Sequence, residues 1–212
     1  MPQLTTFFIQ NGVPEYALVW MFMIPIAMTV VVAARQIVGV KGLGVIAPIL
    51  LGFAFTATGA KYGLIMFLVA LIATFVMRSL LSRVRLLYLP KMGLLLSGVA
   101  VSVMFAASVI PYREEVQFPQ AAFSLIIFIL LVEQFASHLI ERGPRETFNA
   151  ALHTLVLSLA VFFVVTWDWL NDAVVSYPLF VLAAVVISNF VLGKWTGLRV
   201  VEYIRFKDLI FK

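Results

Sequence analysis

The chain has 212 residues, of which 63% are hydrophobic and 12% are charged, and its formal net charge is +5. Soluble domains are roughly half apolar and a quarter charged, so this composition excludes an ordinary soluble domain and predicts an integral membrane protein. The absence of cysteine excludes a disulfide framework, a thiolate metal site and a cysteine nucleophile.

Seven apolar segments follow one another along the chain, and we predict that each spans the membrane. A span needs about 20 apolar residues. The chain is therefore expected to be a single all-α domain, residues 1–212, folded as a seven-transmembrane-helix bundle. The predicted spans cover residues 15–38, 43–58, 61–82, 92–110, 119–140, 147–170 and 173–192.

The second predicted span is short and carries Gly44, Pro48, Gly52 and Thr56 at a spacing of four. Small residues at this spacing allow helix backbones to approach closely. A tightly packed ordinary helix is the preferred interpretation. The alternative is a broken or re-entrant helix, which a membrane tolerates only where it is buried in protein or lines a cavity.

Charge predicts the orientation of the bundle. With the N-terminus outside, 13 basic residues fall on the cytoplasmic side and only Lys61 and Arg113 on the outer side, as the positive-inside rule requires. The chain is thus expected to be a multi-pass protein of the bacterial inner membrane with a cytoplasmic C-terminus. The basic residues assigned to the inside are Arg35, Lys41, Arg78, Arg83, Arg85, Lys91, Arg142, Arg145, Lys194, Arg199, Arg205, Lys207 and Lys212.

The residue pattern of the tail, residues 194–212, predicts an amphipathic helix at the membrane surface. Arg199, Glu202, Arg205, Asp208 and Lys212 follow at spacings of three or four and form one polar stripe. A stripe of alternating charge beside apolar residues is typical of an interfacial helix. The net positive charge is therefore attributed to membrane anchoring, and no nucleic-acid partner is expected.

Polar residues inside the fifth and sixth segments form the candidate intramembrane site. Glu133 and its neighbours Gln134 and His138 lie on the fifth segment, and Asn149 and His153 lie on the sixth. A tight hairpin about Gly143 would bring 134 near 153 and 138 near 149. These groups are expected to face the bundle interior, because a carboxylate in lipid is costly.

Three interpretations of this site stay open. Glu133 could be satisfied structurally by His153, or by Arg35 or Arg78 from the same half of the membrane. It could titrate in a proton or ion path with His138 or His153 as relay. The cluster could also form a polar ligand pocket open to the cytoplasm. A metal site is not expected, because residues 133 and 138 do not share a helical face, and neither a catalytic motif nor a cofactor motif is found.

Three stretches resemble a known bacterial family. They are Ala34 to Phe55, Glu133 to Phe148 and Gly193 to Phe206, in the same order and spacing. The family is a seven-helix membrane domain usually fused to an inactive transglutaminase-like domain. The resemblance also singles out a set of cytoplasmic motif residues. These are Glu141, Arg142, Gly143, Pro144, Arg145, Trp195, Gly197, Arg199, Glu202 and Arg205.

The resemblance implies a non-enzymatic signalling or scaffold subunit linked to peptide sensing or peptide modification. Since only about 14 residues precede the first span, the chain is expected to be the membrane domain alone. Its expected partners are the lipid bilayer, a separate transglutaminase-like protein or ATP-grasp ligase, and a second copy. The alternative is a transporter or exporter subunit for an anionic peptide or polymer. It rests on the short second span with its glycines and proline, on Glu133, and on a weaker similarity to the membrane subunit of poly-gamma-glutamate synthase.

Overall fold

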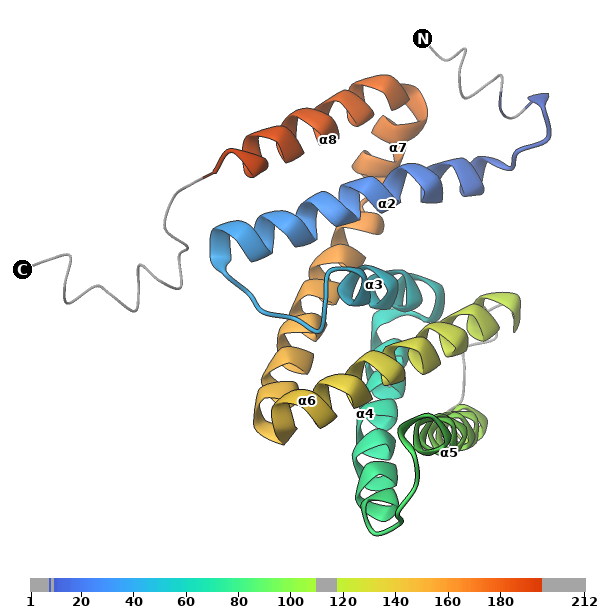
Figure 1. Cartoon of the computed structure of the whole chain (residues 1–212). Helices are drawn as coiled ribbons and strands as arrows, with labels where there is room; N and C mark the ends of the chain where they lie inside the picture. Colours follow the sequence, from blue (N-terminus) through green and yellow to red (C-terminus); the bar gives the residue numbers. More distant parts are fainter. Residues whose placement is uncertain (1–7, 9, 110–117, 196–212) are drawn as a thin grey trace, which may run out of the picture. The chain divides into compact units, whose positions relative to one another are not determined.

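The computed structural model describes residues 8, 10–109 and 118–195 (Figure 1). All regular structure in these residues is helical, which confirms the all-α class. The chain divides into two compact units, which are described separately. The terminal unit comprises residues 1–41 and 163–212, and the central unit comprises residues 42–162. The single-domain expectation stays a prediction.

The terminal unit is built on α2 (Glu15–Ala33), which packs against α7 (Asp168–Ser176) and α8 (Pro178–Gly193). Asn189 Nδ2 of α8 donates a hydrogen bond to Thr29 Oγ1 of α2 at 2.6 Å. The Thr29 hydroxyl in turn donates to the carbonyl of Pro25 at 2.9 Å. Polar bonds of this kind hold helices together where no water competes for them.

The first helix continues without a break into the π-helical turn η1 (Ala34–Val38). Gly39 ends it, because its φ of 90° lies in the left-handed region that favours glycine. Within η1, Gln36 Nε2 donates to the carbonyl of Leu192 on α8. The helical run of residues 15–38 therefore agrees with the first predicted segment.

The structure corrects the predicted sixth and seventh segments. The sixth segment stops at Val165 rather than at residue 170, because Trp167 has an extended ψ of 109° and starts the new helix α7. The predicted seventh span, residues 173–192, is not one straight helix, since α7 and α8 meet at an angle of 110°. Pro178 causes this bend, because the residue before proline is disfavoured in helical conformation and Tyr177 has φ −135° and ψ 56°.

The central unit contains α3 (Ile46–Thr58), α4 (Ala60–Ser82), α5 (Tyr88–Val109) and most of α6 (Phe118–Val165). These helices share one hydrophobic core, with Leu51, Phe55, Met66 and Phe128 among its most deeply buried residues. The bounds of α4 match the predicted 61–82 within one residue. The helix α5 begins four residues before the predicted 92.

Helix α3 lies at the centre of this core. Nine of its 13 residues are buried, as expected for a helix that is apolar on every side. The helix is regular throughout, and Pro48 stands in its first turn, where a missing N–H costs no intrahelical bond. At 1.5 Å per residue α3 is about 20 Å long, shorter than the ~30 Å hydrocarbon core of a bilayer.

Helix α6 consists of two arms that meet at Gly143, whose φ of 80° and ψ of 174° are not helical. In Figure 1 the ribbon changes direction between the yellow first arm and the orange second arm. The break between the predicted fifth and sixth segments therefore lies at Gly143, and the tight hairpin about it stays a prediction. Proline at the first position of the second arm suits a helix start.

Four helices are long and apolar enough to cross a membrane, and the bent α7–α8 pair brings this to five among the described residues. The run from residue 123 to 165 counts once in this total, although its 43 residues are about twice the length that one span needs.

Candidate functional site

Two polar side chains of the first α6 arm carry buried atoms without a partner. Gln134 Oε1 and His138 Nδ1 are fully enclosed, and neither has a hydrogen-bond partner within the described residues. The two residues are four apart, so they lie on the same side of the helix. An enclosed polar atom without a partner costs about 1–3 kcal/mol. The pair is therefore a desolvation cost that the described part of the central unit leaves without compensation.

The segment before α3 packs against both α6 arms, next to Gln134 on the first arm and Thr154 on the second. The Leu43 N–H donates to Thr154 Oγ1 of the second arm at 2.8 Å, and the same hydroxyl donates to the Ala150 carbonyl at 2.8 Å. A Cβ on Gly44 would lie 3.5 Å from Gln134 Oε1 of the first arm. We call Gly42, Gly44, Gln134 and Thr154 the polar cluster, and His138 lies one turn after Gln134 on the first arm.

Glycine is required at both glycine positions of the polar cluster. A Cβ on Gly42 would lie 2.9 Å from Thr154 Oγ1, which leaves no room for a side chain. Gly44 has a φ of +131°, which other residues rarely adopt. The backbone can therefore approach α6 closely enough for the Leu43 N–H to reach Thr154.

The structure brings together only part of the predicted intramembrane site. Gln134 and His138 are partly buried on the first arm, and His153 is partly buried on the second arm. Arg35 is partly buried in η1 of the terminal unit. The interior position expected for Glu133 and Asn149 is wrong, because both side chains are exposed.

Helical spacing explains the exposed position of Glu133. Residues Val132, Phe135 and Ala136 of the same arm face the core of the central unit and are at most 6% exposed. Glu133 instead shares its side of the helix with Leu130 and Ile126, which are 50% and 57% exposed. The core thus packs against the side of the arm that carries Val132, Phe135 and Ala136, and the side that carries Glu133 lies outside it.

The cytoplasmic motif residues fall into two groups. Around the α6 turn, Gly143 is partly buried and its charged neighbours are exposed. Trp195 is 48% exposed at the end of α8. The remaining motif residues, and with them the predicted tail helix, lie outside the described residues. The exposed members of the turn are Glu141, Arg142, Pro144 and Arg145.

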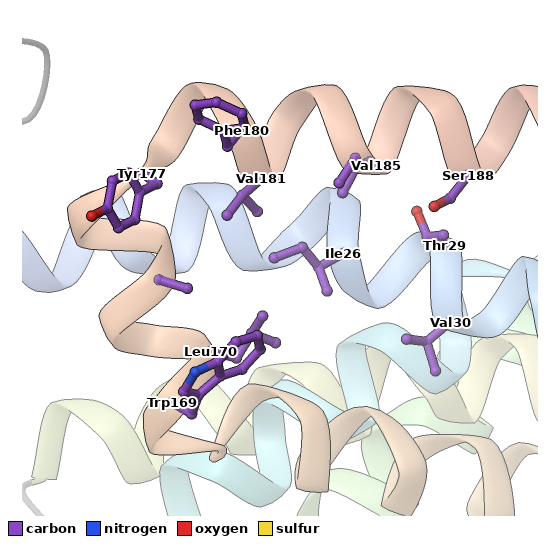
Figure 2. A pocket seen from close by; sticks show the side chains of 12 residues that line it. Ile26, Thr29, Val30, Trp169, Leu170, Tyr177, Phe180, Val181, Val185 and Ser188 are labelled. Carbon is purple, nitrogen blue, oxygen red and sulfur yellow. The ribbon is translucent and has the colours of Figure 1, made fainter. Parts of the chain in front are cut away.

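The bend between α7 and α8 forms an apolar groove in the terminal unit with a volume of about 690 Å³. Figure 2 shows Trp169 and Leu170 of α7, Phe180 and Val181 of α8, and Ile26 of α2 around it. Its lining is almost entirely hydrocarbon, and the lining side chains that carry a polar atom are Thr29, Trp169, Tyr177 and Ser188. Such a groove suits an apolar chain rather than a polar ligand.

Sequence reasoning missed the contribution of Gly42, the Leu43 N–H and this groove. The tripeptide Gly42-Leu43-Gly44 was a local signal for an unusual backbone. Its partner Thr154 is 111 residues away, so no local pattern could identify it. The groove depends on the 110° bend at Tyr177, and Pro178 was a signal for that bend.

Comparison with known proteins identifies the family. Residues 11–210 match the model of the family described as seven transmembrane helices usually fused to an inactive transglutaminase. The chain belongs to this family. No curated protein matches the chain, and no solved structure matches it.

Replacing Gln134 by leucine is expected to raise stability. The enclosed Oε1 has no partner within the described residues, so removing it relieves a desolvation cost and should add up to about 1 kcal/mol to the free energy of unfolding. The matched control is Gln36→Leu, which removes an amide that donates to the Leu192 carbonyl and should be destabilising. Thermal unfolding in mild detergent measures both. A stability loss in Gln134→Leu would mean that a bound water or ligand satisfies Oε1.

Proposed function

We propose that this member of the family is a non-enzymatic subunit of the bacterial inner membrane, with a signalling or scaffold role linked to peptide sensing or modification. The family match over residues 11–210 carries this proposal. Members of this family are usually fused to a transglutaminase domain that is inactive. The fused domain therefore does not catalyse a reaction. An inactive enzyme domain can still bind a peptide, and a receptor needs binding without catalysis.

The proposed orientation places the N-terminus outside and the C-terminus in the cytoplasm. It is supported by the count of 13 basic residues on the proposed cytoplasmic side against two on the other. The exposed charged turn at Glu141, Arg142 and Arg145 would then face the cytoplasm and be available to a soluble partner. A C-terminal fluorescent-protein fusion that stays dark while alkaline phosphatase at the same position is active would contradict this orientation.

The alternative is a transporter for an anionic peptide or polymer, which a re-entrant second span and a buried Glu133 would support. Helix α3 is regular and buried, and Glu133 is exposed on the side of α6 away from the core. These two observations favour the scaffold interpretation.

Affinity purification of the full chain from native membranes in mild detergent tests the proposal. We expect recovery of a transglutaminase-like protein or an ATP-grasp ligase in a fixed ratio to the tagged chain. A tagged membrane protein of similar size and unrelated fold serves as the control. Recovery of the chain alone would contradict the scaffold role, and substrate flux by the purified chain in proteoliposomes would favour the transporter.

A further inference from the structure

One side of the first α6 arm is an exposed apolar stripe interrupted by a single acid. We call it the Glu133 face and define it as Phe123, Ile126, Leu130, Glu133 and Ile140. Its four apolar members are 45–57% exposed, and Glu133 is exposed with them. The spacings of three, four, three and seven keep these residues on one side of a helix.

The carboxylate on this face has no partner within the described residues. No ion pair or side-chain hydrogen bond joins Glu133 to any of them. Glu133 follows Phe118 by 15 residues and precedes Gly143 by 10, which places it about 22 Å and 15 Å along the helix from these ends. The acid therefore lies well inside a membrane-spanning arm. Ionisable groups at such depth are rare and are usually paired.

We propose that the Glu133 face docks a transmembrane helix of a partner protein that carries lysine or arginine at the matching depth. An apolar stripe offers packing to any helix in the bilayer, and the acid selects the helix that has a complementary charge. A second copy docked by twofold symmetry about this face would place two carboxylates together, which is unfavourable. A partner of opposite charge satisfies the stripe and the acid at once.

This inference deepens the scaffold role proposed above and rests on it. The two can fail separately. If a complex is recovered from membranes but is indifferent to Glu133, the scaffold role stands and the docking surface is wrong.

A defined probe tests the docking surface. The full chain, which has no natural cysteine, is labelled at a cysteine introduced at Ser82 and reconstituted in phosphatidylcholine vesicles. Two labelled Leu-Ala helices of about 20 residues are added, identical except for one lysine placed to face Glu133. Energy transfer should show that the lysine helix binds about tenfold more tightly than the lysine-free helix.

Matched variants complete the test. Glu133→Gln should abolish the preference for lysine, whereas Glu141→Gln, an exposed acid at the end of the same arm, should keep it. Leu130→Trp should obstruct binding without altering charge. Val156→Trp, at a site of similar exposure (54%) on the second arm, should not.

Three results would overturn the proposal. Equal binding of the two helices would remove the role of charge. An unchanged preference in Glu133→Gln would remove the role of this acid. Tighter binding of the lysine helix by Arg35→Gln would show that the chain's own arginine already occupies the acid, either within one molecule or between two copies.

Discussion

Gly52→Ala is expected to lower the free energy of unfolding by about 1–3 kcal/mol, as overpacking of a core does. A Cβ at Gly52 of α3 would lie 2.5 Å from Val161 Cγ1 and 3.1 Å from the Ser158 carbonyl oxygen of α6. The β-branched valine has little rotamer freedom in a helix, and the carbonyl belongs to the backbone. Neither neighbour can move aside cheaply, so α3 and α6 must separate. Thermal or denaturant unfolding in detergent measures the loss.

Gly98→Ala is the matched control for this loss. A Cβ on Gly98 of α5 would approach Met77 Sδ of α4 to 2.6 Å, nearly the same distance as at Gly52. Methionine is unbranched and flexible, so it can swing away. The gain in helix propensity, up to about 1 kcal/mol, should then leave Gly98→Ala neutral or stabilised. Equal stability losses in both variants would contradict the argument from side-chain stiffness.

A double-mutant cycle localises the effect to one contact. Val161→Ala alone should cost stability by opening a cavity. It should cost less in the Gly52→Ala background, where it relieves the clash. Strict additivity of the two changes would show that Gly52 and Val161 do not contact each other.

Thr154→Val is the second substitution with a large expected effect. It keeps the shape of the side chain but removes the oxygen that accepts the Leu43 N–H at 2.8 Å. Leu43 is only 4% exposed, so its N–H is left enclosed and without a partner. The expected loss is about 1–3 kcal/mol. Faster hydrogen exchange of the Leu43 amide would report the broken bond directly.

Two controls accompany this substitution. Thr154→Ser keeps the hydroxyl and should retain most of the stability and the amide protection. Thr56→Val removes a hydroxyl whose only hydrogen bond within the described residues goes to the Gly52 carbonyl of its own helix, and it should change stability little. If Thr154→Val behaves like Thr56→Val, the segment before α3 is not held by α6.

The local features of the chain were predictable because hydropathy and turn chemistry act over short distances. The range of α4 follows from an uninterrupted apolar run. The turn at Gly143 follows from a glycine before a proline between charged residues. Family membership was also predictable, since it depends on the order and spacing of motifs such as Glu141-Arg142-Gly143-Pro144.

The sequence by itself determined that this is an all-helical membrane protein and where most of its helices lie, because a lipid-compatible helix must be apolar along its whole length. Only the tertiary structure decided which side of each helix faces the core. It directed Phe135 inward and Glu133 outward, and it joined Leu43 to Thr154 across 111 residues of chain. The physical reason is that every side of a membrane helix is apolar, so close packing rather than hydropathy selects the buried side.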